Sequence, residues 1–381
     1  PAIKFHQNNL MQTERFLLKN IYSSEFINGF ADVLAQTLPQ FNKPDFVAQV
    51  FDEEWEQREL KQRMKHLSQV LHHFLPQHFP KAAQVIVALI EKLKTAGFTK
   101  HGLEFMFLPD YIEKFGLEFF EESVQAMEQL TKFTSCEFAV RPFILKYEAK
   151  MLQQMTQWSG HENEHVRRLA SEGSRPRLPW AVALPALKRD PKPVLPLLEN
   201  LKQDPSEYVR RSVANHLNDI SKDNPDVLLA LAQQWKNISP ETDRILKHAC
   251  RTLLKQGHPQ ALQLFGLNNC DQIELKMFEV LTPQVQIGDY LQFALHFQNT
   301  HLQPQKIRLE YGIDYLKANG SLSRKVFKIS EKEYAPQEQV QISRRQSFKR
   351  ITTRKFYPGP HRVALIMNGV EQQVAEFELL E

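Results

Sequence analysis

The chain has 381 residues, of which 42% are hydrophobic, 10% aromatic and 24% charged, and its formal net charge is +4. That length fits two domains, and the composition is that of a folded protein without low-complexity tracts. No apolar run approaches the roughly 20 residues that cross a bilayer, so we expect no transmembrane span. The first residues, PAIKFHQNNLMQTERF, contain no apolar segment of the kind that secretory signals need, so we expect no signal peptide.

The cysteines bear on the redox environment of the protein. Cys136, Cys250 and Cys270 are odd in number and form no CxxC pair. We therefore expect neither a disulfide framework nor a zinc–cysteine site, and a reducing cytoplasm is the natural location.

Helical periodicity runs from about residue 17 to residue 265. Apolar residues recur there at three- and four-residue spacing, which is typical of amphipathic helices. Proline-containing joints such as LPQHFPK separate one helix from the next. One apolar face, in the run RELKQRMKHLSQVLHHF, consists of Leu60, Met64, Leu67, Leu71 and Phe74.

A sequence repeat lies inside this helical part. The segments HENEHVRRLA (161–170) and DPSEYVRRSV (204–213) match in pattern, and their valines, Val166 and Val209, are 43 residues apart. A looser copy, ETDRILKHAC, begins at Glu241. An acidic helix start followed by Val-Arg-Arg at this period is typical of HEAT-like repeats. We therefore predict helical pairs that stack into a solenoid, with each valine buried.

From Ile273 onward the apolar period drops to two, which indicates β-strands. Asn-Gly and Pro-Gly pairs at 319–320, 358–359 and 368–369 mark turns between strands. Seven strands in about 110 residues predict an immunoglobulin-like sandwich. The expected fold is thus mainly α, a HEAT-like α-helical repeat solenoid over residues 1–268, followed by a small all-β immunoglobulin-like sandwich over residues 269–381.

Positive charge is concentrated in the predicted sandwich. Between Ser321 and Arg362, eleven Lys and Arg stand against three acidic residues, a net charge of +8. Such a patch suits a polyanion, although a solvated basic strand face is a common alternative. The cations of the sandwich that we predict to contact DNA are Arg344, Arg345, Lys349 and Arg350.

Two arginines follow the buried valine in each repeat, and we expect them to line successive turns of one face. Many cations along one solenoid surface match a spaced row of phosphates. The alternative for these arginines is that they bond an acid in the neighbouring repeat, as HEAT-repeat arginines often do. For the polar residues Asn215, His216 and Asn218, the alternative is that they lie on an ordinary helix surface. The helical residues predicted to bind DNA are Arg167, Arg168, Arg175, Arg210, Arg211, Asn215, His216 and Asn218.

Three blocks of sequence carry a family resemblance: FTSCEFAVRPFI (133–144), EHVRRLASEGSRPRLPW (164–180) and EYVRRSVANHLNDISKDNP (207–225). Together they resemble the AlkC family of bacterial DNA glycosylases, relatives of AlkD among the HEAT-like alkylation-repair glycosylases. The likeness extends through LLKNIYSSEFINGF near the start and covers the helical part. The appended sandwich agrees with it, because many AlkC-type proteins carry an immunoglobulin-like domain there.

The resemblance implies hydrolysis of the N-glycosidic bond of cationic N3-methylated bases, 3-methyladenine and 3-methylcytosine, in duplex DNA without base flipping. It places the catalytic residues at Glu137, Glu172 and Trp180. Methylation at N3 already activates the leaving base, so fixed carboxylates and an aromatic face suffice for the chemistry. We expect no cofactor and no metal, since no ligand cluster can be assembled from the motifs. The expected partner is double-stranded DNA, bound by a monomer and away from any membrane.

Each catalytic candidate also has a purely structural interpretation. Glu137 fits a helix-capping box with Thr134 as N-cap. Glu172 stands four residues after Arg168 and fits an intrahelical salt bridge, although the helix macrodipole disfavours an acid at that end. Trp180 fits the core at the start of the next helix. At the level of function, the alternatives are a non-catalytic DNA-binding sensor of damage and a HEAT-repeat protein scaffold.

Overall fold

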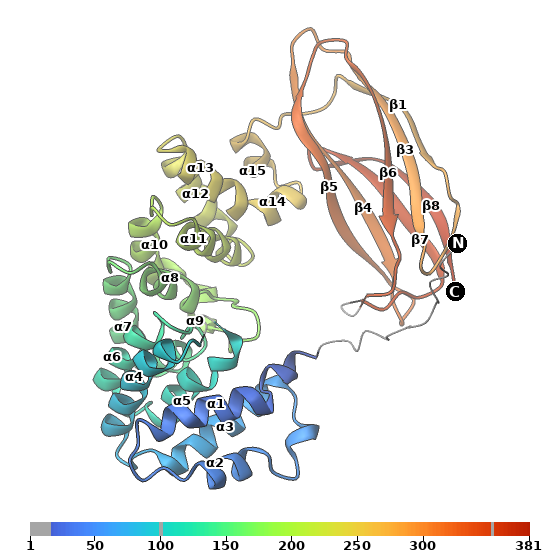
Figure 1. The fold of residues 1–381 in the computed structure, drawn as a ribbon. Coiled ribbons are helices and arrows are strands. Elements are labelled where there is room, and N and C mark those ends of the chain that lie inside the picture. Colours follow the sequence, from blue (N-terminus) through green and yellow to red (C-terminus); the bar gives the residue numbers. More distant parts are fainter. Residues whose placement is uncertain (1–16, 99–101, 352–353) are drawn as a thin grey trace, which may run out of the picture. The chain divides into compact units, whose positions relative to one another are not determined.

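The computed structural model describes residues 17–98, 102–351 and 354–381 (Figure 1). The segment considered for a signal peptide, residues 1–16, lies outside the described residues. The chain divides into two compact units, residues 1–216 and residues 217–381. Among the described helices, none is both long enough and apolar enough to cross a membrane.

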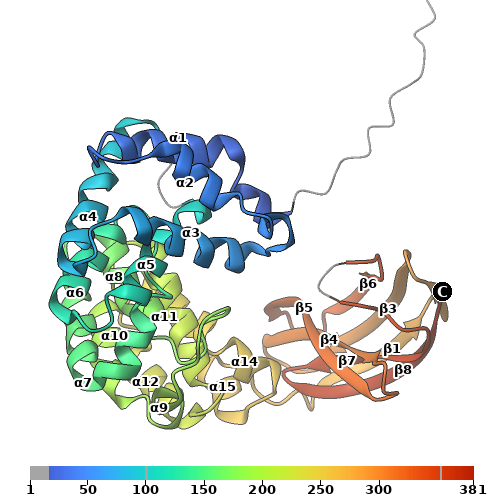
Figure 2. The same cartoon turned by 90° about the horizontal axis from the view of Figure 1, so that it is seen from below.

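The first unit is a stack of helices that follow one another in approximate chain order (Figure 1, Figure 2). Short 3-10 turns, η1 (Leu18–Ile21), η2 (Trp55–Gln57), η3 (Leu103–Phe105) and η4 (Lys192–Val194), lie between them. The helices are α1 (Ser24–Ala35), α2 (Lys43–Val50), α3 (Leu60–Phe74), α4 (Phe79–Thr95), α5 (Phe107–Phe115), α6 (Phe120–Leu130), α7 (Val140–Trp158), α8 (Glu164–Gly173), α9 (Pro185–Arg189), α10 (Leu195–Leu201) and α11 (Glu207–Ile220), of which the last continues into the second unit.

The shared pattern of the two sequence repeats corresponds to a shared local structure. Val166 on α8 and Val209 on α11 are both fully buried, as predicted. The arginine after each valine donates to the backbone carbonyls five and six residues before it, Arg167 to Glu162 and His161, and Arg210 to Pro205 and Asp204. The same local bond pattern thus shapes the start of both helices.

The C-terminal end of α8 is held tightly against the start of α7. A Cβ atom at Gly173 would lie 2.5 Å from Cγ2 of Val140, so only glycine permits this approach. The fully buried guanidinium of Arg141 donates to the carbonyls of Gly173 at 2.9 Å, Arg175 at 2.8 Å and Val182 at 2.6 Å. Arg141 therefore pairs carbonyls that the helix end leaves open, and it fixes the path of the chain after α8.

The second unit contains the last helices and a sandwich of two sheets (Figure 1). Its helices after α11 are α12 (Pro225–Trp235), α13 (Pro240–Ala249), α14 (Arg251–Lys255) and α15 (Pro259–Leu264). Its strands are β1 (Ile273–Val280), β2 (Gln284–Gln286), β3 (Tyr290–Asn299), β4 (Gln305–Leu316), β5 (Leu322–Tyr334), β6 (Gln339–Ser347), β7 (Gly359–Met367) and β8 (Val370–Leu380).

Among the described residues, one sheet has the order β1-β3-β6 and the other the order β2-β8-β7-β4-β5. All seven predicted strands are present, and the sequence analysis missed only β2, which pairs in parallel with the end of β8. The predicted fold class, a helical repeat region followed by an immunoglobulin-like sandwich, is confirmed. The two compact units meet at 216–217, inside the helical part, so this division does not test the boundary at 268–269. The domains 1–268 and 269–381 stay a prediction.

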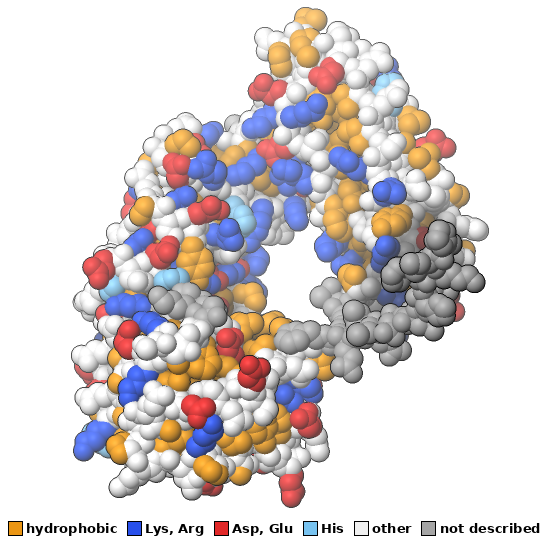
Figure 3. All heavy atoms as spheres, viewed as in Figure 1, with side chains coloured by type: hydrophobic (Ala, Val, Ile, Leu, Met, Phe, Trp, Pro, Cys, Tyr) orange, Lys and Arg blue, Asp and Glu red, His pale blue; other side chains and the backbone are white. Residues whose placement is uncertain are grey.

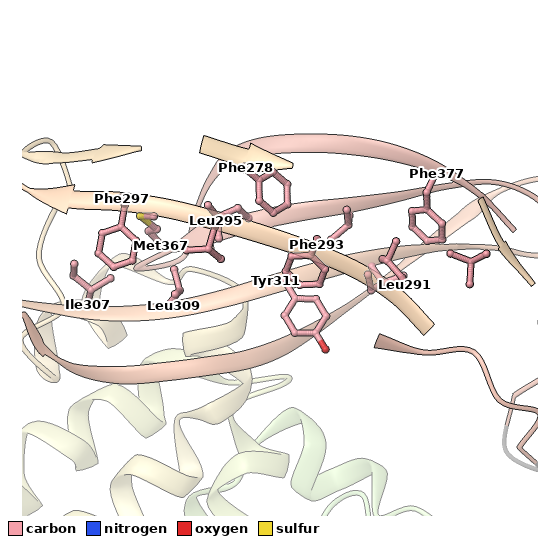
Figure 4. Packing of buried hydrophobic residues seen from close by; sticks show 14 of the residues in the cluster. Phe278, Leu291, Phe293, Leu295, Phe297, Ile307, Leu309, Tyr311, Met367 and Phe377 are labelled. Atoms are coloured by element: carbon pink, nitrogen blue, oxygen red, sulfur yellow. The ribbon is translucent and has the colours of Figure 1, made fainter. Parts of the chain in front are cut away.

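The two sheets enclose a core of large apolar side chains (Figure 4). Alternate residues of β3 point inward, and Leu291, Phe293, Leu295 and Phe297 are all fully buried. Burying side chains of this size contributes about 1.5–3 kcal/mol each, so this face of β3 specifies the register of the sandwich.

The outer face of β4 is buried as well, but it is polar. Arg308 is 5% exposed and Glu310 is fully buried, and the two are paired at 2.6 Å. Arg308 also pairs with Glu331 of β5 at 2.9 Å, and Glu331 accepts a hydrogen bond from Lys247 of α13. In addition, Lys306 donates a hydrogen bond to the Phe265 carbonyl at 3.0 Å. The ion-pair cluster and this bond connect the last helices to the sandwich within the second unit.

Candidate active site

A cavity of about 360 Å³ opens within the first unit, and the three catalytic candidates share it. Its walls come from α3, α5, the turn before α7, α8 with the segment that follows it, and the start of α11. The side chains that matter for its chemistry are Glu113, Glu137, Phe138, Arg168, Glu172, Arg175, Trp180 and Tyr208. Glu137, Glu172 and Trp180 are thus brought together by the fold, and their catalytic role stays a prediction.

Glu137 lies in the turn that precedes α7, not in the first turn of a helix. The capping-box interpretation is therefore wrong, since α7 begins at Val140 and its N-cap is Ala139, not Thr134. One carboxylate oxygen, Oε2, accepts hydrogen bonds from Arg168 at 2.7 Å and from the Ser135 hydroxyl at 2.9 Å. The side chain is 19% exposed, so it presents a fixed negative charge to the cavity.

Glu172 is buried, with only 8% of its side chain exposed, at the C-terminal end of α8. Its Oε1 lies 2.5 Å from Nη1 of Arg175 and 3.8 Å from Nη2 of Arg168. Its Oε2 accepts a hydrogen bond from the Ser212 hydroxyl at 2.6 Å. The predicted intrahelical pair with Arg168 exists, but Arg175 and Ser212 hold the carboxylate more closely, and together they offset the cost of burying the charge.

Trp180 is 63% exposed, which rules out the interpretation as a core residue. Its backbone φ is +66°, in the left-handed region that a bulky residue rarely occupies. The carbonyl of Trp180 accepts a hydrogen bond from Lys61 of α3, whose ammonium group also lies 5.4 Å from the ring centroid of Phe138. Strain of this kind persists where the surrounding structure fixes it, and here it presents an indole at the cavity.

Arg168 connects the two carboxylates. Its guanidinium lies 4.7 Å from the ring centroid of Tyr208, on α11, and its side chain is only 16% exposed. Burial by itself would lower the pKa of Arg168, but the charges of Glu137 and Glu172 outweigh burial and raise that pKa. The arginine therefore stays charged, and its positive charge offsets the charges of both carboxylates inside one cavity.

A third acid lines the cavity, and the sequence analysis did not find it. Glu113 lies on α5 in the sequence YIEKF, where an acid reads as an ordinary exposed helix residue. Burial, reinforced by the nearby charge of Asp110, raises the pKa of Glu113 to about 7. Asp110 is 7% exposed and accepts a hydrogen bond from Ser68, and burial raises its pKa as well. No sequence motif marks this position, because its surroundings include Lys61 and Lys65 of α3, which is distant in the sequence.

The predicted DNA-binding arginines of the helical part lie in different surroundings and have different partners. Arg167 forms an ion pair with Asp204 at 2.6 Å and 3.0 Å, which is the inter-repeat bond named as the alternative. Arg168 and Arg175 line the cavity, where they hold the two glutamates. Arg211 is 66% exposed and lies 3.3 Å from Glu207. A single row of arginines along one face is therefore not what the structure shows.

Two of the polar residues predicted to touch the DNA backbone are buried. His216 is fully buried, and its Nδ1 bonds the carbonyl of Ser171 at 2.9 Å. Asn218 is 2% exposed and donates to the Ala249 carbonyl at 2.9 Å and to the Thr252 hydroxyl at 2.8 Å. Burial corrects the expectation for these two, since neither has surface left for a phosphate. Asn215 is half-buried, and its DNA contact stays a prediction.

The four cations predicted on the sandwich, Arg344, Arg345, Lys349 and Arg350, are all exposed. Arg345 and Lys349 lie over the ring of Tyr290, at 5.2 Å and 5.5 Å from its centroid. Other cations of the basic stretch are paired with acids: Arg324 with Asp314 and Glu371, Lys328 with Glu331, Lys332 with Glu338, and Arg362 with Glu376. Much of the +8 charge is therefore balanced locally. Among the described residues, the cations of this stretch without an ion pair lie after residue 343, apart from Lys325, which lies over the ring of Phe327.

Among the described residues, no three His, Cys, Asp or Glu side chains are grouped as a metal site. What the cavity offers is negative charge fixed by two arginines, a third acid of raised pKa, and exposed aromatic rings. Such a site attracts and stabilises positive charge, whether on a bound group or in a transition state.

Comparisons with known proteins bear on both parts of the chain. A family model described as a DNA alkylation repair enzyme matches residues 103–272, and the C-terminal Ig-like domain of the uncharacterised protein YhaZ matches residues 274–381. The uncharacterized protein YhaZ of Bacillus subtilis (strain 168) is 45% identical over 362 residues, which cover 95% of this chain and 99% of that protein.

A solved structure is similar to this chain over nearly its whole length. The Pseudomonas fluorescens alkylpurine DNA glycosylase AlkC, bound to DNA containing an abasic site analog, matches with a TM-score of 0.90 and 37% sequence identity. The match covers 96% of this chain and 100% of that chain. With its helical repeats, its immunoglobulin-like sandwich and these relatives, this chain belongs to the AlkC-type family of DNA alkylation-repair proteins.

Proposed function

We propose that this protein is a monofunctional DNA glycosylase that hydrolyses the N-glycosidic bond of cationic N3-methylated bases, 3-methyladenine and 3-methylcytosine, in duplex DNA. The observation that carries the proposal is the convergence of Glu137, Glu172 and the exposed indole of Trp180 on one cavity. The relative with the solved structure is an alkylpurine DNA glycosylase, and it was captured on DNA with an abasic site analog.

The chemistry of the lesion explains why two paired carboxylates are enough. A base methylated at N3 carries a positive charge, so it leaves as a neutral molecule without protonation by an enzymic acid. The charge that develops instead is on the sugar, whose transition state resembles an oxocarbenium ion. Glu137 and Glu172 are held in place by Arg168, Arg175 and Ser212, so they stabilise that charge without reorganising.

Trp180 supplies the second element of recognition. An indole face within about 6 Å of a cation is attracted to it by roughly 0.5–2 kcal/mol. The indole is 63% exposed and its backbone is fixed by Lys61, so it meets the lesion at the surface of the protein. An exposed aromatic contact of this kind suits a base that stays in the duplex, and we include excision without base flipping in the proposal.

The partner that we propose is double-stranded DNA with methylated bases, bound by a monomer in the cytoplasm. Arg211 on α11 and the exposed Arg344, Arg345, Lys349 and Arg350 are the cations available to phosphates. The sandwich, residues 269–381 in the proposed division of the chain, thus adds charge-based affinity to a catalytic helical domain, residues 1–268.

A non-catalytic sensor of damaged DNA is the second candidate, because the exposed cations serve binding as well as catalysis. Base release separates the two functions. The protein is incubated with a duplex that carries one 3-methyladenine, 3-methylcytosine or hypoxanthine, with and without EDTA, and free bases are separated by chromatography. We expect release of both methylated bases, unaffected by EDTA, and little hypoxanthine, which is neutral. Tight binding without any released base would identify a sensor.

A further inference from the structure

The proposed function leaves one acid of the cavity unused. Glu113 lines the same cavity as Glu137 and Glu172, yet its carboxyl group makes no hydrogen bond or ion pair with any residue in the described part of the chain. By contrast, both oxygens of Glu172 are occupied, by Arg175 and Ser212, and Oε2 of Glu137 is occupied by Arg168 and Ser135. The cavity therefore contains two fixed carboxylates and one unpaired carboxyl group.

Charged groups of both signs surround Glu113. Asp110 lies one turn earlier on α5, and Lys61 and Lys65 lie on α3. Lys114, the next residue along α5, is bonded to Gln69. The remaining charges of the cavity are Glu137, Glu172, Arg168 and Arg175, which are paired with one another. Burial and Asp110 raise the pKa of Glu113 to about 7, while the two lysines act in the opposite direction.

We propose that Glu113 is the general base of the reaction and accepts the proton of the attacking water. This inference rests on the proposed glycosylase function. As the bond between the anomeric carbon and the base nitrogen breaks, its electron pair leaves with the base and neutralises the positive charge. The water oxygen forms the new bond to the anomeric carbon, and one water proton moves to the Glu113 carboxylate, which later releases it to solvent. Atoms and charge balance without any other reactant.

The three acids then divide the work according to their partners. A carboxylate that shares its oxygens with a guanidinium is suited to stabilise positive charge at a fixed place. A proton acceptor needs a free oxygen and a proton affinity matched to the working pH. Glu113 has both, since its oxygens have no bonded partner in the described structure and its pKa is about 7. Glu137 and Glu172 keep the electrostatic role.

The pH dependence of base release tests this assignment. The experiment measures kcat/KM from pH 5.5 to 8.5 on a duplex with one 3-methylcytosine, for the wild type, E113Q, E113D and the control E91Q. Glu91 is 76% exposed and does not line the cavity, so E91Q controls for loss of one carboxylate. Circular dichroism and DNA binding confirm that each variant folds, which we expect because E113Q removes an unpaired, half-buried acid.

We expect kcat/KM of the wild type and of E91Q to rise with pH and to level off above about 7. E113Q should lose about 10²–10⁴-fold at neutral pH and the rise should disappear, whereas E113D should keep the rise at a reduced rate. The assignment is overturned if E113Q matches the wild type, or if it is slower but keeps the same pH profile. If the wild type releases no base at any pH, the proposed function fails, and that outcome is distinct from either of these.

Discussion

At the scale of single residues, the site depends on how each acid is partnered. Glu172 is buried at the wrong end of a helix for a negative charge, and two arginines and a serine hydroxyl hold it there. Removing one partner of such a buried pair costs more than the pair itself contributes, because the other charge is left without compensation. A carboxylate kept at this cost is consistent with a role in function.

Glu113 gives a prediction about stability. Its pKa is about 7 in the folded protein and near 4.5 when exposed, so between these values the folded state binds more protons than the unfolded state. The free energy of unfolding must therefore fall as pH rises from about 4.5 to 7. E113Q has no carboxyl group at this position and therefore lacks this pH dependence, so its free energy of unfolding relative to the wild type should increase by on the order of 3 kcal/mol between pH 4.5 and 7. Urea denaturation at several pH values measures the difference, and a constant difference would contradict the raised pKa.

The sequence predicted part of the site because the motif residues lie in contiguous blocks. Glu137, Glu172 and Trp180 were found through their family resemblance, and the structure brings them to one cavity. Glu113 and Tyr208 were missed, since their place at the cavity depends on how α5 and α11 pack against distant segments. The burial of His216 was missed for the same reason: helical spacing alone does not tell which neighbour covers a side chain.

At the scale of elements, periodicity predicted most of the fold, and its failures are informative. Long strands such as β3 and β4 were found because alternation extends over ten or more residues. The three-residue β2 was missed, because so short a segment shows no period and is defined by its pairing with β8. Equally hidden was the buried polar face of β4, which looks like an exposed strand face in the sequence.

The ion-pair cluster between α13 and the sandwich gives a second prediction. Burial would raise the pKa of Glu331, but its bonds with Lys247 and Arg308 outweigh burial and lower that pKa. E331A should therefore reduce the free energy of unfolding by about 3 kcal/mol, since it removes the acidic partner of the half-buried Lys247 and leaves the buried Arg308 with Glu310 alone. Because the pKa is lowered, this contribution exists above pH 4.5 and is lost as pH falls below it.

The matched control for this cluster is E333A, on the same strand but exposed. We expect a change within about 0.5 kcal/mol there, as for most surface substitutions. Guanidinium denaturation at pH 7 followed by circular dichroism measures both variants. Equal stability of E331A and E333A would show that the cluster contributes little.

At the scale of the whole molecule, charge distribution decides how DNA is bound. Lys and Arg side chains are spread over the visible face of both units (Figure 3). Many of these cations are paired with acids, which reduces their attraction for phosphates. In the sandwich, we predict that the exposed Arg344, Arg345, Lys349 and Arg350 contact the DNA backbone. The loop that we also consider for DNA contact, residues 347–353, includes Thr352 and Thr353, which lie outside the described residues.

Neutralising these four cations, in the variant R344Q/R345Q/K349Q/R350Q, should weaken DNA binding and flatten its salt dependence. Each phosphate contact contributes a slope of about 0.9 in log K against log salt concentration, so up to about 3.6 is lost if all four make contacts. Fluorescence anisotropy between low and near-physiological salt measures the slope. The control K332Q/R362Q removes cations that already have acidic partners, and it should change the slope less per charge. An unchanged slope in the fourfold variant would indicate that the sandwich docks another partner.

The central claim is that Glu137 and Glu172 stabilise the transition state of base excision, and single-turnover release of 3-methyladenine tests it most directly. The transition state gains a positive charge on the sugar that the bound abasic product lacks, so the carboxylates matter for rate more than for binding. E137Q and E172Q should each slow release by at least about 10²-fold, while DNA binding changes little and E91Q releases at the wild-type rate. E172Q should also lose stability, since the buried Arg175 loses its charged partner, so the rates are compared on protein that circular dichroism shows to be folded. If E137Q and E172Q both keep most of the single-turnover rate, the carboxylates do not carry the chemistry and the account is contradicted.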